Sequence, residues 1–463
     1  MFDIDTAVDE NMEGLVRDIK RLVAHYSVQG EPSPGRPFGD GPAEAVEEAE
    51  KIASELGFLT KNYDNFALTA EMGEGDSLVG IIGHLDVVPV GEGWEHDPFA
   101  GDIIDGVMYG RGVTDDKGPS LAALYAMKIV RDSGFPVTKR VRFLFGANEE
   151  TGMKGVAHYK EIEGEFDCGF TPDASFPLIF GEKGNYNARF FGETSREGAK
   201  VAIKYFNGGM AANVVCDRVS LYAEMNAFAP ELKEHFAAYA AENGMGYTVR
   251  EDEDDLVLTL QGVSAHASTP ELGKNAISHM MRFVSSEKLF SCPFAEGYDR
   301  VIGLSYTGEN CGVAISDVYG PLTFNVGIIG TNMDGTYATI DIRYPITTED
   351  FGVYSEKMKE VFAASGLTLT ETRIGPSLFI DPDSPLVKKL YEAYVMGTGD
   401  TVNKPVTIGG GTYAKAFKNI VAFGPEFPGK EYNIHMNDEF MPLETLRTAL
   451  KTYVYAIMAL LEI

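Results

Sequence analysis

In the first part of the chain, apolar segments of strand length alternate with segments of helical spacing, and this alternation constrains the fold most strongly. Small and apolar residues recur at helical spacing from Ala43 to Leu56, and the Val- and Ile-rich run from Ser77 to Val90 indicates a buried strand. A further helix is expected over Ser120 to Arg131 and a further strand over Arg140 to Gly146. Such alternation predicts an α/β fold with a mostly parallel sheet flanked by helices.

The pattern changes after about Gly184, which indicates a second domain. Strand-like segments such as Leu256 to Gln261 are separated there by helix-like ones, and the first pattern resumes at about Pro385. A chain of 463 residues also exceeds what one hydrophobic core normally organises. We predict a discontinuous first domain over residues 1–184 and 381–463, with an α+β domain inserted over residues 185–380.

Charge and cysteine usage exclude several classes of partner. The formal net charge of −30 repels nucleic acids and anionic membrane surfaces, and we find no basic segment that would offset it. The N-terminal segment is acidic where an export signal needs a basic start and an apolar core. Four cysteines without a C-x-x-C pair favour reduced thiols. We therefore expect a cytoplasmic protein with neither a nucleic-acid nor a membrane partner.

Two residues at the end of the first buried strand are candidates for metal chemistry. His84 and Asp86 are two positions apart, so their side chains leave the strand on the same face. A ligand histidine usually gives its second ring nitrogen to a carboxylate, a role that Asp86 can fill. An H-x-D triplet also arises often by chance, so this interpretation depends on the rest of the sequence.

Acidic residues follow the other predicted elements of the first domain. Asp115 and Asp116 lie in a glycine-flanked turn before a helix, where Asp116 equally fits an N-cap. Glu149 and Glu150 follow a buried strand, and adjacent glutamates point in different directions, so one can hold a metal while the other moves a proton. Asp173 follows a short strand, where a turn aspartate is the ordinary alternative. These positions correspond to the sheet edge where open α/β sheets bind ligands.

His435 adds a second histidine from a loop near the far end of the chain. Taken alone, it fits an ordinary surface loop. Together with the acids and His84 it forms a set of oxygen and imidazole ligands without sulfur, which suits zinc, manganese or cobalt. The order and placement of the whole set, rather than any single motif, favour a metal centre.

Taken together, these motifs resemble the aminoacylase and carboxypeptidase G superfamily of co-catalytic metallopeptidases, and within it the dipeptidase V branch. The resemblance extends over essentially the whole chain and is carried by residues 83–89, 94–99, 109–119, 148–150, 172–173 and 435. It implies two divalent ions, zinc first and manganese or cobalt as alternatives. The implied ligands are His84 and Asp173 for one ion, Glu150 and His435 for the other, and Asp115 bridging both.

The resemblance also implies the reaction. A water between the two ions would attack the peptide bond of a dipeptide whose amino and carboxyl ends are free. Glu149 would be the catalytic base, Asp86 would orient His84, and the bond between Asp115 and Asp116 would be cis. The first domain would therefore be the metal-binding catalytic domain.

The inserted domain is implied to be a lid that binds the substrate. His266 matches the lid histidine that meets the oxyanion, and Asn213 and Arg343 match positions that contact the substrate. The guanidinium fork of Arg343 suits a carboxylate, and a salt bridge at the end of a strand is the alternative. The loop Gly410, Gly411 and Thr412 would bring N–H groups near the same carboxylate. Because this branch carries its lid histidine within one chain, a monomer is expected.

Two other functions remain open from the sequence. An N-acyl amino-acid amidohydrolase of the same superfamily would share the chemistry and differ only in the pocket for the amino end of the substrate. A non-catalytic metal- or peptide-binding protein is disfavoured because Glu149 and His266 are both present. The ligand set accepts zinc and manganese alike, and the sequence does not rank α-dipeptides against β-alanyl ones.

Overall fold

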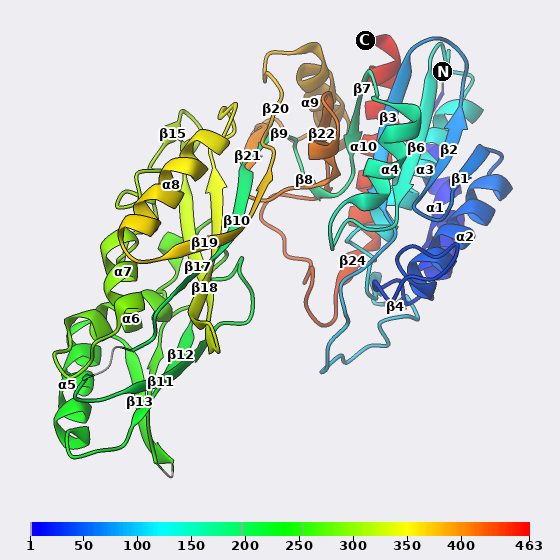
Figure 1. Cartoon of the computed structure of the whole chain (residues 1–463). Coiled ribbons are helices and arrows are strands. Elements are labelled where there is room, and N and C mark those ends of the chain that lie inside the picture. The colour runs from blue at the N-terminus through cyan, green and yellow to red at the C-terminus, as the bar shows by residue number, and fades with distance from the viewer. Residues whose placement is uncertain (1, 196–197, 253) are drawn as a thin grey trace. The chain divides into compact units, whose positions relative to one another are not determined.

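The computed structural model describes residues 2–195, 198–252 and 254–463, and the chain divides into two compact units. The first unit comprises Met1–Glu182 and Leu378–Ile463, and the second comprises Lys183–Ser377. The first unit therefore contains both chain termini, coloured blue and red in Figure 1. The assignment of the first unit as the catalytic domain and of the second as the lid stays a prediction.

A nine-stranded mixed sheet forms the centre of the first unit. Its order is β1-β2-β6-β3-β7-β22-β9-β20, with β21 beside β9. The strands are β1 (Leu59–Tyr63), β2 (Ala67–Met72), β3 (Leu78–His84), β6 (Arg140–Gly146), β7 (Cys168–Thr171), β9 (Ile179–Glu182), β20 (Leu378–Phe379), β21 (Val406–Ile408) and β22 (Ile420–Ala422). The central strands β6, β3, β7 and β22 run parallel, whereas β1, β2, β9 and β20 pair in antiparallel fashion. The predicted α/β class is confirmed, and the parallel pairing is concentrated at the centre of the sheet.

Both faces of the central strand β3 are covered, which explains its unbroken apolar sequence. Every residue of β3 is buried. A side chain added at Gly83 would meet Ser120 of helix α3 (Lys117–Asp132), whereas one added at Gly80 would meet the ring of Phe166. Positions three apart on a strand face opposite sides of the sheet. Helix α3 therefore covers one face and the segment around Phe166 covers the other.

Helices surround this sheet (Figure 1). They are α1 (Ile4–Val23), α2 (Asp40–Glu55), α3, α4 (Lys154–Glu163), α9 (Pro385–Thr398) and α10 (Leu443–Glu462). Helix α10 packs against α1, α3 and α9, and most of its apolar residues are buried. It is the core helix that its composition predicts. Among the described residues, none of the helices is both long and apolar enough to cross a membrane.

The second unit is built on an antiparallel sheet of eight strands. Its order is β13-β14-β12-β11-β17-β18-β10-β19. The strands are β10 (Gly184–Gly192), β11 (Ile203–Gly208), β12 (Arg218–Glu224), β13 (Gly246–Asp252), β14 (Asp255–Gln261), β17 (Thr323–Asn332), β18 (Gly335–Tyr344) and β19 (Thr368–Gly375). Four helices accompany it: α5 (Ala229–Glu242), α6 (Ala276–Ser286), α7 (Pro293–Val301) and α8 (Gly352–Ala364).

Alternate residues of this sheet pack with the helices in one apolar core. Leu256, Leu258 and Leu260 of β14 belong to it, as do Ile340 and Ile342 of β18. Because side chains alternate along a strand, the odd-numbered residues of β18 face the other side of the sheet. That side carries polar and charged residues, Asp341 and Arg343 among them.

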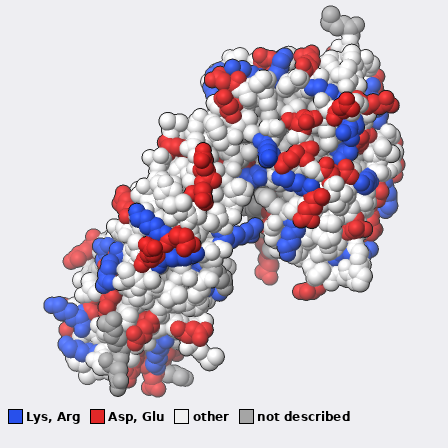
Figure 2. Space-filling model, turned by 45° about the horizontal axis from the view of Figure 1, so that its top comes forward, with Lys and Arg blue, Asp and Glu red and all other residues white. Residues whose placement is uncertain are grey.

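Charged side chains are distributed over the surface. On the face seen in Figure 2, acidic and basic side chains of the described residues are interspersed.

Candidate metal centre

The candidate ligands of the first unit meet at the carboxyl ends of its parallel strands. His84 ends β3 and lies in register with Gly146, the last residue of β6, and Glu149 and Glu150 come three and four residues after the end of β6. Asp173 comes two residues after the end of β7, which pairs with the other side of β3. Open α/β sheets bind their ligands at this edge. The strand order therefore brings together residues that are far apart in the sequence.

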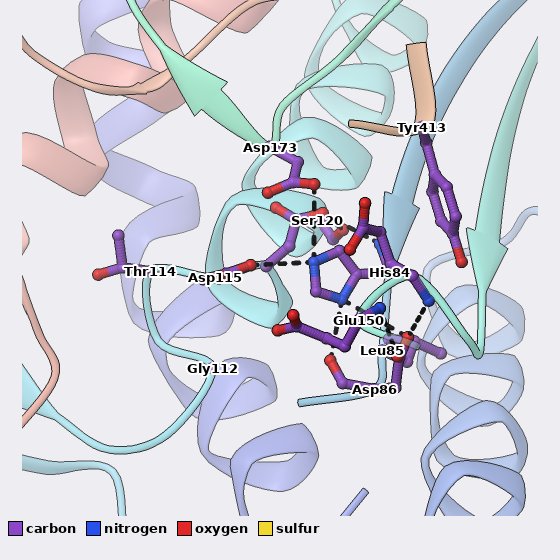
Figure 3. Close-up of polar contacts among 12 residues, drawn as sticks. His84, Leu85, Asp86, Gly112, Thr114, Asp115, Ser120, Glu150, Asp173 and Tyr413 are labelled. Carbon is purple, nitrogen blue, oxygen red and sulfur yellow. Dashed lines mark hydrogen bonds and ion pairs between the residues drawn. The ribbon is translucent and has the colours of Figure 1, made fainter. Parts of the chain in front are cut away.

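One group of ligand atoms surrounds the ring of His84 (Figure 3). The Nε2 atom of His84 lies 2.9 Å from Oδ1 of Asp115 and 3.7 Å from Oδ2 of Asp173. The His84 side chain is buried, with 1% of its surface exposed, so it has lost the water that would otherwise solvate these groups. These three residues are the predicted ligands of one ion and the predicted bridge.

A second group of ligand atoms surrounds His435. Its Nε2 atom lies 2.8 Å from Oδ2 of Asp115 and 3.2 Å from Oε1 of Glu150. The two oxygens of Asp115 therefore face two different histidines. A carboxylate in this position can bridge two cations, one on each side.

The donor atoms fit a bound metal ion. Nδ1 of His84 donates a hydrogen bond of 2.9 Å to the backbone carbonyl of Asp86, so a cation that displaced the proton on Nε2 would meet the lone pair of that atom. One ligand atom each of His84, Asp115 and Glu150 lies within 4.8 Å of the others. A lone pair and several anionic oxygens that converge on one point attract a cation, and hard oxygen and imidazole donors suit zinc, manganese or cobalt.

The carboxylate of Asp86 holds the two glutamates in place. Its Oδ1 accepts a hydrogen bond of 2.9 Å from the backbone N–H of Glu149, and its Oδ2 accepts one of 3.1 Å from that of Glu150. The same carboxylate lies 3.6 Å from Nδ1 of His84. The predicted orienting role of Asp86 toward His84 stays a prediction. Its contact with both glutamate backbones was not predicted.

Glu149 is an acidic residue next to the predicted ligand Glu150 that itself stays outside the two ligand groups. Burial first, and then the charge of Asp173, raise the pKa of the Glu149 carboxyl well above its ordinary range. Cations among the neighbouring carboxylates would oppose this increase in pKa. A carboxylate whose pKa is adjusted by such neighbours can exchange a proton near neutral pH.

The turn that presents Asp115 has the peptide geometry that the resemblance implies, since the bond between Asp115 and Asp116 is cis. Asp116 occupies the N-cap position of α3, yet its side chain makes no capping hydrogen bond. Its Oδ2 atom accepts hydrogen bonds from the Ser120 hydroxyl at 2.8 Å and from the backbone N–H of His84 at 3.0 Å. Asp116 thus joins the turn to the end of β3.

The buried Glu439 also holds this turn, and sequence reasoning gave it no role. Its Oε1 atom accepts hydrogen bonds from the backbone N–H groups of Gly112, Thr114 and Asp115 at 3.1, 2.9 and 3.2 Å. Its Oε2 atom pairs with Arg111 at 2.8 Å. The one available signal was the position of this acid four residues after His435, in a segment otherwise read as a loop.

The glycine-rich loop lines a cavity beside the centre. Gly410, Gly411 and Thr412 border a cavity of about 220 Å³ together with Asp115 and Asp173. The backbone N–H and the hydroxyl of Thr412 donate to the buried Glu182 at 2.9 and 2.7 Å. These donors hold the loop in this structure, and the predicted contact of the loop with a substrate carboxylate stays a prediction.

The predicted lid residues lie close together within the second unit. His266 and Val214 form an isolated bridge, and the N–H of Ala267 donates to the carbonyl of Asn213 at 2.9 Å. The hydroxyl of Thr323 donates to the carbonyl of Ala267 at 2.9 Å. Thr323 is the register partner of Arg343, which connects all three predicted residues through one part of the sheet.

Arg343 is positioned by a buried aspartate. Its Nε and Nη2 atoms donate to the two carboxylate oxygens of Asp341 at 2.7 and 3.1 Å. Both residues are odd-numbered members of β18 and face away from the helices, whereas Ile340 and Ile342 face the core. The guanidinium therefore lies on the side of the sheet that the helices leave uncovered.

Comparisons with known proteins show the family to which the chain belongs. The model of peptidase family M20/M25/M40 matches residues 80–459. YtjP of Bacillus subtilis is 34% identical over 98% of this chain and 99% of its own length. SH1171 of Staphylococcus haemolyticus is 34% identical over 98% of each chain. The names of both relatives class them provisionally as dipeptidases.

Solved structures share the fold over nearly the whole chain. Human carnosine dipeptidase 1 has a TM-score of 0.58 at 15% identity and covers 99% of this chain and 98% of its own. The dipeptidase Dug1p of Saccharomyces cerevisiae has a TM-score of 0.59 at 13% identity, with the same coverage. At sequence identities this low, the similarity shows only that the fold is shared. The family model matches most of this chain, and relatives above 30% identity match it over nearly its full length. The chain therefore belongs to peptidase family M20/M25/M40.

Proposed function

We propose that the protein is a metallo-dipeptidase that hydrolyses dipeptides whose amino and carboxyl ends are both free. The observation that carries this proposal is Asp115, whose two oxygens face His84 and His435 at 2.9 and 2.8 Å. Glu149 lies at the same edge of the sheet, shortly after the end of β6. A shared carboxylate beside a free acidic group is the arrangement that two-metal hydrolysis requires. The names of the full-length relatives, which class them as dipeptidases, support the substrate.

Two divalent ions are proposed as cofactors, with zinc first and manganese or cobalt as alternatives. His84 and Asp173 would hold one ion, Glu150 and His435 the other, and Asp115 both. When bound, the ions would acidify the attacking water and polarise the scissile carbonyl. Asp86 would keep the backbone of Glu149 and Glu150 in place through its two hydrogen bonds.

The chain's own residues would move the proton and hold the substrate. Glu149 would take a proton from the attacking water and return it to the departing amine. In the second unit, His266 would donate to the oxyanion, and Asn213 and Arg343 would bind the substrate, with the fork of Arg343 on its carboxylate. The pairing of Arg343 with Asp341 supports this role because it fixes the orientation of the guanidinium.

We also propose a cytoplasmic monomer. The four cysteines Cys168, Cys216, Cys292 and Cys311 are free, which fits a reducing compartment. The inserted segment over residues 185–380 is long enough to supply the lid histidine within one chain, as the resemblance implies for this branch, and this supports the monomer.

One experiment tests the proposed substrate and metal together. The protein is stripped with a chelator, restored with zinc, manganese or cobalt, and assayed on free dipeptides, their N-acetyl forms and tripeptides. The proposal predicts hydrolysis of free dipeptides that depends on the restored metal. Faster cleavage of the N-acetyl series would instead favour an N-acyl amino-acid amidohydrolase, and retention of full activity after metal removal would exclude a metallopeptidase.

A further inference from the structure

The cavity beside the metal centre contains a third carboxylate that the proposed ligand set does not use. The cavity of about 220 Å³ is lined by Glu426 as well as by Asp115 and Asp173. The two aspartates are accounted for as predicted ligands. Glu426 lies outside both ligand groups, so its charge needs another explanation.

The backbone fixes Glu426 next to the centre. Strand β23 (Pro425–Glu426) runs parallel to β8 (Ala174–Ser175), with Glu426 in register with Ser175. The N–H of Phe176 donates to the carbonyl of Glu426 at 2.7 Å. Strand β8 begins directly after Asp173. The position of Glu426 relative to Asp173 is therefore determined by paired backbone and not by a loose loop.

The carboxylate of Glu426 has no cationic partner among the described residues. The nearby Ser175, its register partner, only lowers the pKa of the carboxyl slightly against the other causes. Burial first, and then the charges of Asp115 and Asp173, raise its pKa to about 6. A partly buried carboxylate in an acidic cavity is costly unless a cation accompanies it in the working state of the enzyme.

The proposed substrate carries such a cation at the required place. In a dipeptide with a free amino end, the ammonium nitrogen is one carbon removed from the scissile carbonyl carbon, at about 2.5 Å from it. When that carbonyl lies at the metal centre, the ammonium must lie at the border of the centre. An N-acyl amino acid presents an apolar group there instead.

We propose that the Glu426 carboxylate binds the free ammonium group of the first residue of the substrate and thereby selects unblocked dipeptides over N-acyl amino acids. This inference rests on the proposed dipeptidase function and adds the residue that decides between it and the amidohydrolase alternative. A charge-assisted hydrogen bond from the ammonium to Glu426 would neutralise the extra charge of the cavity. Glu426 is here a specificity residue and not a metal ligand.

The test uses two substrates that differ only in the amino group, alanyl-leucine and propionyl-leucine. The isosteric variant Glu426→Gln keeps the size of the side chain but loses its charge. It is expected to lower kcat/KM for alanyl-leucine by about 10- to 100-fold and to change kcat/KM for propionyl-leucine by about twofold at most. Glu431→Gln, at an exposed position on the same segment, is the matched control and should leave both substrates unchanged.

Metal content and melting temperature are measured on the same metal-loaded preparations, and both should equal those of the wild type. Equal losses on both substrates, or loss of a metal ion from Glu426→Gln, would overturn the inference because the carboxylate would then serve the metal or the fold. An unchanged preference for alanyl-leucine would overturn it as well. A wild-type enzyme that prefers propionyl-leucine, or that fails to cleave alanyl-leucine, would contradict the proposed function, and this inference would fall with it.

Discussion

The backbone N–H of Asp115 donates a hydrogen bond of 3.2 Å to the carboxylate of Glu439. Glu439 lies four residues after His435, so one short segment carries a candidate ligand and also holds the turn that presents the candidate bridging carboxylate. The buried pair of Glu439 with Arg111 fixes that segment in turn. The relative position of Asp115 and His435 is thus supported by hydrogen bonds from backbone N–H groups of the turn to the Glu439 carboxylate, and does not depend on a metal ion alone.

Replacement of Glu439 by glutamine should weaken both the fold and the metal centre. The amide cannot replace the charge beside Arg111, and breaking a buried ion pair of this kind costs about 3–5 kcal/mol. We expect a lower free energy of unfolding in urea and a larger Kd for the metal in a calorimetric titration. Glu431→Gln is the control. Wild-type stability and metal affinity in Glu439→Gln would show that Glu439 does not hold the turn.

Replacement of Asp86 by asparagine should impair turnover more than stability. The amide oxygen can still accept a hydrogen bond from the N–H of one of the two glutamates. The NH2 group would face the N–H of the other glutamate, which then has no acceptor. Changes beside metal ligands commonly cost about 10- to 100-fold in activity or metal affinity. Steady-state kinetics at saturating metal, with circular dichroism as a check on folding, would measure the effect. Full kcat in this variant would contradict the positioning of Glu149 by Asp86.

Replacement of Arg343 by lysine should reduce recognition of the free carboxyl end of the substrate. Lysine keeps the charge but lacks the planar fork that Asp341 aligns. We expect kcat/KM for free dipeptides to fall by about 10- to 100-fold. For dipeptide amides, which lack the carboxylate, wild type and variant should differ little. Equal losses on both substrate series would assign Arg343 to the fold of the second unit.

Metal uptake by the stripped protein should release protons. Hydrogen bonds with Asp115 and then Glu150 raise the pKa of His435 to about 10, so the ring is protonated at pH 7 when no ion is bound. A metal ion must displace that proton, and the affinity should increase with pH up to the raised pKa. Calorimetric titrations in buffers of different ionisation enthalpy would count the protons. An affinity that is independent of pH between 6 and 9, with no proton release, would contradict His435 as a ligand.

The sequence allowed the α/β class and the edge of the sheet that carries the site to be predicted, because buried parallel strands have unbroken apolar sequences. The run from Leu78 to His84 is such a strand, and it ends at the predicted ligand. The antiparallel strands β1, β20 and β9 were less evident. Strand β1 is partly exposed, whereas β9 and β20 are short and pair with each other across a long separation in the sequence.

The residues that support the site were harder to predict than the candidate ligands. Ligands follow from residue type, since histidines and acids after strands have few other reasons to gather. Glu439 and Glu426 are also acids, but their roles depend on which backbone or cavity they reach, and this is decided by pairing between distant segments. Tyr413 is a similar case, since its ring packs edge-to-face against His84 with centroids 6.1 Å apart. No sequence pattern marks such a contact.

Glu149 is proposed to move the proton in a two-metal hydrolysis, and the variant Glu149→Gln tests this role. Metal content and the turnover of alanyl-leucine would be measured on the same preparation. We expect the variant to bind the same two metal ions per chain as the wild type, while kcat falls by about 100- to 10,000-fold. Turnover close to that of the wild type with both metal ions bound would contradict the assignment of Glu149 as the catalytic base.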